Sequence, residues 1–214
     1  MLIEHKFLEN LGQVLSKYPD ADLKDLFSKG QLRSKRWLIS KLLELDLDLG
    51  NVFLCAGWYG ALASYMFDAN LKINFIRSFD IDESCADIAD TLNRDWVINK
   101  WKFKASTLDI SLMHYPLTYT TLRVDGLSKT LTEMPDTIIN TSCEHIKNFN
   151  SWYENIPLNT LLVLQTNNFY EITDHVNCSE SVEDFDKSTP MKTTMYLGEI
   201  SLPTYKRFMK IGIK

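Results

Sequence analysis

The sequence lacks an apolar run of the ~20 residues that a membrane-spanning helix needs, so we expect no transmembrane segment. Its first residues, MLIEHKFLENLG, contain no apolar signal core and carry Glu4 and Glu9, so they are not typical of a secretion signal. The four cysteines show no C-x-x-C spacing, which favours reduced thiols over a disulfide framework. His175 and Cys178 form an isolated H-x-x-C, a weak metal pattern, and no metal site is assigned. These absences predict a cytoplasmic protein.

Positive charge is also scarce. The 214 residues carry a formal net charge of −5, whereas binding to nucleic-acid phosphates needs a concentrated basic surface. We therefore expect a small-molecule substrate and neither nucleic acid nor a membrane as a partner, while the oligomeric state stays open. The 45% hydrophobic content is sufficient for one α/β domain with a real core.

Hydrophobic spacing divides the chain into a helical beginning and a longer segment in which strands alternate with helices. Such alternation favours a parallel sheet with right-handed crossovers. Residues 171–190 are polar and acidic and predict a loop, and Gly30 is expected to end the second helix. The expected helices are 4–17, 20–27, 32–45, 61–67, 83–93 and 149–155, and the expected strands are 52–55, 73–79, 101–105, 120–124, 137–140, 161–165, 195–202 and 206–213.

The most informative segment runs from residue 51 to residue 82. An apolar strand leads into a turn with Gly57 and Gly60, a helix of small residues follows, and a second strand ends on Asp80, 23 residues after Gly57. In α/β proteins such a turn brings backbone N–H groups to a nucleotide, and the carboxylate accepts hydrogen bonds from ribose hydroxyls. A G-x-G-x-x-G fingerprint is absent, and Trp58 argues against a bound pyrophosphate. A nucleoside without phosphates remains compatible with the turn.

These segments resemble those of class I S-adenosylmethionine-dependent methyltransferases. In that family a strand, a G-x-G-x-G turn and a second strand ending in an acid follow one another. VFLCAGWYGALA is similar to the first part, with Ala56 and Trp58 at the first two glycine positions and Gly60 at the third, and SFDIDESC is similar to the second. DTIINTSCEHI resembles the family's fourth strand, and NTLLVLQTNN its fifth.

The resemblance covers about residues 50–214 and implies a Rossmann-like α/β fold. It predicts a mostly parallel seven-stranded sheet with a C-terminal antiparallel hairpin. Residues 49–214 would form the S-adenosylmethionine-binding domain, and residues 1–48 would form an N-terminal helical extension. The third helix of this extension is basic between Lys29 and Lys41, as expected either for a lid over the pocket or for a solvated helix on the flank of the sheet.

The resemblance also assigns residues. Glu144 and His145 would be catalytic, with His145 as a general base, although a structural pair that orients the turn fits equally. Asn167 and Asn168 would bind substrate or shape a turn. Asp80 and Asp109 would contact ribose and adenine, with an ordinary strand-end acid and a solvated loop acid as the alternatives. The residues implied for the cofactor are Ala56, Gly57, Trp58, Gly60, Asp80, Ile81, Asp109 and Cys143.

The implied function is methyl transfer from S-adenosylmethionine to a small or medium acceptor. Two departures from the family pattern affect the methionine end of the cofactor, because Leu54 replaces the acid usual near the end of strand one and Trp58 stands in the turn. The alternatives are therefore a nicotianamine-synthase-like aminocarboxypropyl transferase and a catalytically silent binding module.

Overall fold

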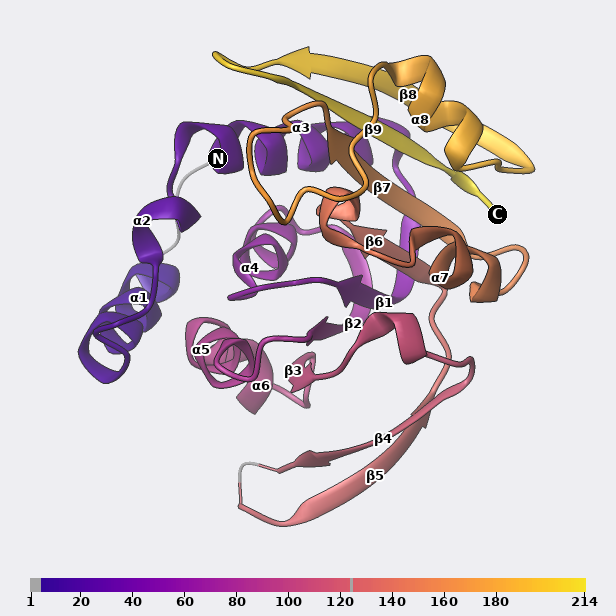
Figure 1. Ribbon diagram of the computed structural model, residues 1–214. Coiled ribbons are helices and arrows are strands. Elements are labelled where there is room, and N and C mark those ends of the chain that lie inside the picture. Colours follow the sequence, from indigo (N-terminus) through magenta and orange to yellow (C-terminus); the bar gives the residue numbers. More distant parts are fainter. Residues whose placement is uncertain (1–4, 124) are drawn as a thin grey trace. The chain divides into compact units, whose positions relative to one another are not determined.

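The computed structural model describes residues 5–123 and 125–214, and the chain divides into two compact units at Leu108 and Asp109 (Figure 1). The expected start of the first helix at Glu4 and the expected strand end at Val124 lie outside the described residues. The elements of the first unit are α1 His5–Lys17, α2 Leu23–Leu26, α3 Lys29–Leu45, β1 Asp48–Cys55, α4 Ala61–Asp68, β2 Lys72–Asp80, α5 Cys85–Leu92, α6 Arg94–Ile98 and β3 Phe103–Thr107.

The second unit begins with a 3-10 turn and a separate hairpin, and it ends with two long antiparallel strands. Its elements are η1 Ile110–Leu112, β4 Leu117–Leu122, β5 Ser128–Glu133, β6 Thr137–Asn140, η2 Cys143–His145, α7 Phe149–Asn155, β7 Leu161–Asn167, α8 Val182–Ser188, β8 Thr193–Ser201 and β9 Lys206–Ile213.

The main sheet has seven strands in the order β3-β2-β1-β6-β7-β9-β8. Within the first unit β1 pairs parallel with β2, and β2 pairs parallel with β3. Within the second unit β6 pairs parallel with β7, whereas β9 runs antiparallel to both β7 and β8. The expected mostly parallel sheet with a C-terminal antiparallel hairpin is thus confirmed.

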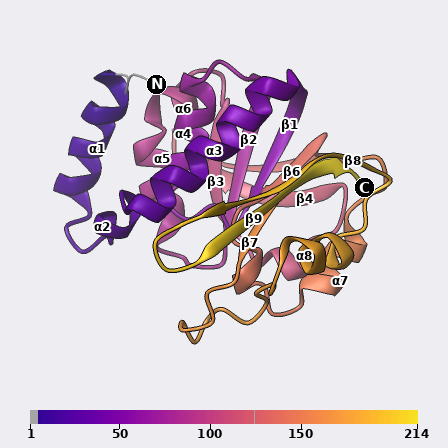
Figure 2. The same cartoon turned by 90° about the horizontal axis from the view of Figure 1, so that it is seen from above.

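Helices cover the strands within each unit. In the first, α5 packs on β2 and β3, α1 lies beside α5, and α3 packs on α4 (Figure 2). The buried rings of Phe53 on β1 and Phe79 on β2 are in edge contact, with ring centroids 5.2 Å apart. In the second unit α8 packs on β8 and β9. The apolar runs that predicted β1 and β7 are buried because both faces of such strands are covered.

The third helix begins earlier than expected. Gly30 does not end the second helix but lies in the first turn of α3, because Ser28 caps that helix and accepts a hydrogen bond from the N–H of Gln31 at 3.3 Å. The helix ends at Leu45 and is followed by its C-cap, Asp46, which adopts the left-handed conformation at φ 48°. No helix among residues 5–123 and 125–214 combines the length and apolarity needed to cross a bilayer.

Two elements of the second unit were not predicted correctly. The single strand expected at 120–124 is half of an antiparallel hairpin, in which β4 pairs with β5. β5 is mostly exposed and polar, so its sequence carries no apolar alternation. The expected loop at 171–190 contains α8, whose N-terminus is capped by Ser181 and whose Phe185 is 1% exposed. β7 also continues two residues beyond the expected end at Gln165, and every one of its residues is buried.

Candidate functional site

The turn after β1 has an unusual backbone. Ala56, Trp58 and Gly60 have positive φ angles of 53°, 49° and 70°. The left-handed conformation costs a non-glycine residue about 1–2 kcal/mol, so glycine is the usual occupant of such positions. The turn therefore adopts the backbone of a glycine-rich loop at all three alternate positions, although two of them hold alanine and tryptophan. Retained strain of this kind is often associated with a functional site.

Asp80 joins this turn to the end of β2. Its Oδ2 accepts the N–H of Trp58 at 2.8 Å, and its Oδ1 accepts the N–H of Asp82 at 3.1 Å. One residue earlier, the carbonyl of Phe79 accepts the N–H of Gly57 at 3.0 Å. Burial raises the pKa of Asp80 above its ordinary value of 3.8, an effect that these backbone hydrogen bonds oppose. A carboxylate accepts up to about four hydrogen bonds, so acceptor capacity is left for ligand hydroxyls.

Side chains around the turn fix its shape. A Cβ on Gly57 would overlap the side chain of Ser78 and approach Leu54, so only glycine fits there without a shift. Leu54, which replaces the acid of the family pattern, is 1% exposed and belongs to the core. The Trp58 ring is half-buried and stacks on Tyr59, with ring centroids 4.6 Å apart. Ile81 is 68% exposed, so its side chain is accessible from solvent.

Asp82 shows the ordinary role that Asp80 does not fill. Its Oδ1 accepts the N–H of Ser84 at 2.8 Å and the Ser84 hydroxyl at 2.7 Å, at the start of α5. These hydrogen bonds lower the pKa of Asp82. Among the described residues, Asp80 makes no such contact with the start of α5, and its role as a ribose ligand stays a prediction.

The expected cofactor residues of the second unit have partners of their own. Asp109 caps η1 and accepts the N–H of Ser111 at 2.9 Å. Cys143 is fully buried at the start of η2, and its carbonyl accepts a hydrogen bond from the side chain of Asn177 at 3.1 Å. Contacts of Asp109 with adenine and of Cys143 with the cofactor stay predictions.

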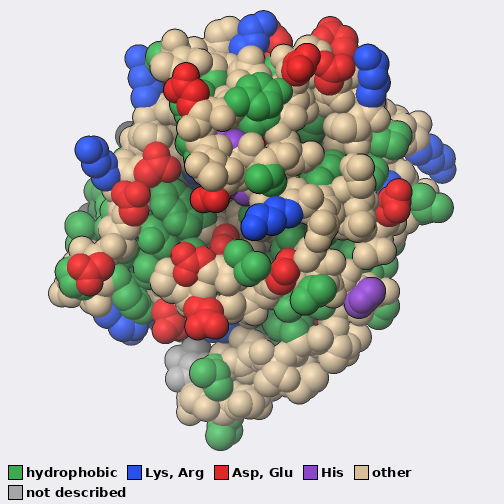
Figure 3. All heavy atoms as spheres, in the orientation of Figure 1, with side chains coloured by type: hydrophobic (Ala, Val, Ile, Leu, Met, Phe, Trp, Pro, Cys, Tyr) green, Lys and Arg blue, Asp and Glu red, His purple; other side chains and the backbone are tan. Residues whose placement is uncertain are grey.

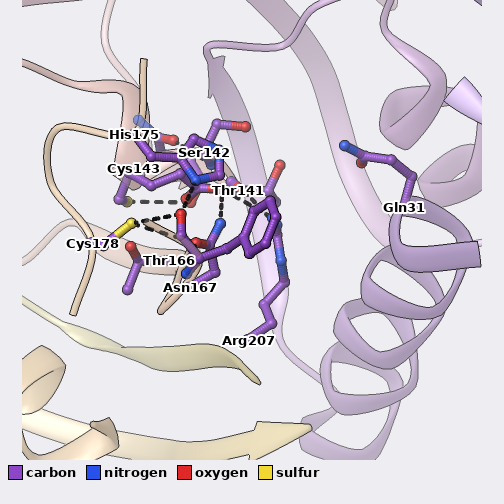
Figure 4. Close-up of polar contacts among 12 residues, drawn as sticks. Gln31, Thr141, Ser142, Cys143, Thr166, Asn167, His175, Cys178 and Arg207 are labelled. Atoms are coloured by element: carbon purple, nitrogen blue, oxygen red, sulfur yellow. Dashed lines mark hydrogen bonds and ion pairs between the residues drawn. The ribbon is translucent and has the colours of Figure 1, made fainter. Parts of the chain in front are cut away.

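Glu144 lies in a buried ion pair in the second unit. Its Oε1 accepts hydrogen bonds from Arg207 Nη2 at 2.9 Å and from Asn167 Nδ2 at 2.6 Å. Figure 4 labels these two donors, Arg207 and Asn167. Asn167 and Arg207 face each other across the β7–β9 ladder, so the sheet register places both donors at one point. Glu144 is 1% exposed, Asn167 1% and Arg207 6%. This arrangement agrees with the structural interpretation of the Glu-His pair, in which Glu144 orients the turn.

His145 faces His175, which the sequence did not connect with it. The two imidazole rings are in edge contact, with centroids 4.6 Å apart and an interplanar angle of 82°. His145 is exposed on part of its surface, yet desolvation lowers the pKa of its ring below the usual 6.5, an effect that Glu144 opposes. The lowered pKa favours the neutral form of the ring, which is the form that a general base uses.

Asn168, the second expected substrate residue, is held by the protein. Its side-chain oxygen accepts the N–H of Lys206 at 2.7 Å, and its own N–H donates to the carbonyl of Lys206 at 3.2 Å. Asn167 and Asn168 therefore both have structural partners, which fits the turn-shaping alternative. Their contact with a substrate stays a prediction.

The surface gives no sign of a polyanion site on the face that Figure 3 presents. Basic side chains there are scattered, mostly near the rim, and do not form a continuous patch. The hollows of the molecule include a cleft of about 750 Å³ in the second unit, which contains no expected site residue. Its lining includes Asn150, Tyr153, Leu158, Pro190, Met191 and Lys214.

Comparison with known proteins gives similarity at the level of the fold. No family model matches this sequence, and no curated protein does. NodS, an N-methyltransferase from Bradyrhizobium japonicum WM9 solved with S-adenosyl-L-homocysteine, superposes with a TM-score of 0.65 over 98% of this chain and 99% of its own at 8% identity. Magnesium protoporphyrin IX methyltransferase from Synechocystis PCC 6803, solved with the same ligand, gives 0.60 over 98% and 95% at 11% identity.

A methyltransferase from Aquifex aeolicus gives a TM-score of 0.56 over 89% of this chain and 95% of its own, at 12% identity. The similarity spans nearly the whole length of all three proteins, and the strand order of the sheet agrees with the expected fold. The chain has the class I methyltransferase fold.

From the sequence alone, the turn after β1 and the acid at the end of β2 were located correctly. The sequence did not reveal His175 and Arg207, which lie far along the chain from Glu144 and His145. The one signal in the sequence that involves His175 was the isolated His175-x-x-Cys178 pattern, which does not point to His145. Only the fold of the second unit reveals that His145 and His175 are neighbours.

Proposed function

We propose that this protein binds S-adenosylmethionine and transfers its methyl group to an acceptor. The observation that carries the proposal is the backbone of the β1–α4 turn, which is left-handed at residues 56, 58 and 60 and is hydrogen-bonded to Asp80. Ligands of open α/β sheets bind outside the carboxyl ends of the strands, where this turn and Asp80 lie. Neighbours of the same fold are solved with S-adenosylmethionine or S-adenosyl-L-homocysteine.

Asp80 would accept hydrogen bonds from the ribose hydroxyls. Its carboxylate is half-buried, and part of its acceptor capacity is left after the two backbone N–H groups are counted. The turn residues Ala56 to Gly60 would lie against the nucleoside, and the half-buried Trp58 would contact it. The bound sulfonium would supply an activated methyl group, so the protein needs no covalent nucleophile.

The contribution of the protein to the reaction is then alignment and exclusion of water. His145 is the residue that we expected to remove a proton from the acceptor, and its lowered pKa leaves a ring nitrogen able to accept one at pH 7. Glu144, with Oε1 in the ion pair to Arg207, would hold the adjacent backbone in place. The acceptor itself is not specified by these residues, and the mass added to it distinguishes methyl from aminocarboxypropyl transfer.

Calorimetric titration with S-adenosyl-L-homocysteine tests the proposal. The Asp80→Ala variant should bind at least tenfold more weakly, because a hydrogen bond to a charged group contributes about 1.5–3 kcal/mol. Asp80→Asn keeps an oxygen that accepts the N–H of Trp58, so it separates the loss of charge from a disturbed turn.

Asp82→Ala is the matched control. Asp82 is two residues away and exposed, and its carboxylate interacts with Ser84 at the start of α5. The Asp82→Ala variant should bind S-adenosyl-L-homocysteine with the same affinity as the parent protein. Equal affinity of the parent and both Asp80 variants would remove Asp80 from the site, and an absence of binding by the folded parent would contradict the proposed function.

A further inference from the structure

A cluster of metal-ligand type lies in the second unit. Glu144, His145 and His175 each offer one ligand atom, and these atoms all lie within 4.8 Å of one another. Nothing in the sequence pattern or in the expected cofactor site requires two histidines to meet a buried carboxylate. Two imidazoles and one carboxylate are the ligand set of several zinc sites and of iron(II) sites with open positions.

The carboxylate of Glu144 has one oxygen left for a ligand. Arg207 and Asn167 both donate to Oε1, whereas Oε2 is buried and has no hydrogen-bond partner among the described residues. A buried polar atom without a partner costs about 1–3 kcal/mol, so such atoms usually have a function or an absent partner. A cation bound to Oε2 would be the missing partner of that atom. Arg207 and Asn167, which donate to Oε1, would then hold the carboxylate in position.

His175 is held by the backbone. Nδ1 of His175 interacts with the carbonyl of Phe169 at 2.5 Å. Because a carbonyl only accepts, Nδ1 carries the proton of the neutral ring, and Nε2 presents a free lone pair. His145 is exposed on part of its surface and lies in edge contact with the His175 ring, with ring centroids 4.6 Å apart. A hydrogen bond from one ring nitrogen to a backbone carbonyl is the usual support of a metal-binding histidine.

Cys178 is close to this group but is a poorer ligand. Its thiol contacts the carbonyl of Phe169 and the side-chain oxygen of Asn167, both at 3.5 Å. Burial raises the pKa of Cys178 to about 11, whereas a metal binds the thiolate. The histidines and Glu144 therefore form the more suitable set.

We propose that Glu144, His145 and His175 bind one divalent transition-metal ion, of the zinc or iron(II) class, through two imidazole nitrogens and Glu144 Oε2. Donor atoms bound tetrahedrally to zinc are about 3.4 Å apart. The three ligand atoms, now within 4.8 Å of one another, therefore have to move closer by rotation of side chains, for which the exposed His145 has the most room. Three protein ligands leave coordination positions for water or for an oxygen of a substrate.

The metal and the general base are competing roles for His145, because an ion would occupy the nitrogen that accepts a proton. The proposal does not depend on S-adenosylmethionine, since all three ligands belong to the second unit and the titration needs no cofactor. A protein that binds no metal would leave the proposed cofactor binding standing, and a protein that binds no cofactor would leave the metal proposal standing.

The test uses the full chain without a histidine tag, freed of metal by a chelator and dialysis. Zn²⁺ is titrated by calorimetry, and Co²⁺ is titrated by its visible absorption, which reports the number and geometry of the ligands. We expect one ion per chain. His145→Ala, His175→Ala and Glu144→Gln should each bind at least tenfold more weakly, because even the partners that support metal ligands typically contribute about 10- to 100-fold.

Two variants are matched controls. His114→Ala removes an exposed histidine of the same unit, and Cys178→Ser removes the neighbouring thiol. Both should bind as the parent does. Thermal melts establish which variants fold. If His175→Ala does not fold, the result for His145→Ala decides the test, because the exposed His145 side chain can be removed without disturbing the core. The proposal is overturned by a folded parent that takes up no stoichiometric ion, by undiminished binding in His145→Ala, or by loss of binding in Cys178→Ser.

Discussion

Ala56→Gly should stabilise this protein, although the replacement of alanine by glycine normally does the opposite. Ala56 has a φ of 53°, and the left-handed conformation costs a non-glycine residue about 1–2 kcal/mol. The greater conformational freedom of glycine in the unfolded chain lowers the free energy of unfolding by about 0.5–1 kcal/mol. The net gain is about 0–1.5 kcal/mol, which in a chain of this size raises the melting temperature by up to roughly 6 °C.

The control is Ala86→Gly. Ala86 is half-buried like Ala56 but lies in the first turn of α5, where glycine destabilises by up to about 1 kcal/mol. Chemical denaturation of the two variants beside the parent should thus give changes of opposite sign in the free energy of unfolding. If Ala56→Gly loses as much stability as Ala86→Gly, the turn does not have the glycine-type backbone, and the main observation behind the proposed function falls.

Three further predictions concern the first unit. Ribose hydroxyls donate to the ionised form of Asp80, and burial raises the pKa of this carboxyl group. Ligand affinity should therefore fall on acidification, at a pH above the ordinary pKa of 3.8. The same pH profile in an Asp80→Asn variant would contradict this. Ligand should change the tryptophan fluorescence of the parent but not of Trp58→Phe, and an undiminished signal in the variant would place Trp58 outside the site. Amides of α3 near the buried Leu38 and Leu42 should be protected from hydrogen exchange without ligand, as for a flank helix, whereas protection that appears only with ligand would indicate a lid.

The central strands β6 and β7 could be predicted because their sequences are mostly apolar and buried along their length. Residues 137–140 were predicted with the observed bounds, as was the helix 149–155. β5 could not be predicted, since its serine, threonine and lysine residues pair with β4 on an exposed surface. α8 was missed because its seven residues are mostly polar, and only Phe185 anchors it in the core.

The candidate site was predictable where it depends on local order. The spacing of the β1 turn and Asp80 follows from one strand–turn–helix–strand segment, and the structure links the two by the Trp58 N–H. The left-handed backbone at Ala56 and Trp58 was not predictable from residue type, because neither side chain favours it. The contact of Glu144 with Arg207 depends on the placement of β9 beside β7, and the contact of His145 with His175 depends on backbone hydrogen bonds from Val176 and Asn177 to the carbonyl of Glu144. Both are long-range contacts, which have no local signature.

The central claim is that the β1–α4 turn and Asp80 bind the nucleoside of S-adenosylmethionine. A crystal structure of the protein with S-adenosyl-L-homocysteine tests it most directly. We predict that both ribose hydroxyls lie about 2.5–3.0 Å from the Asp80 carboxylate, within hydrogen-bond range, and that the ligand contacts the turn at residues 56–60. A ligand bound elsewhere, with the Asp80 carboxylate bonded only to the N–H groups of Trp58 and Asp82, would contradict the account.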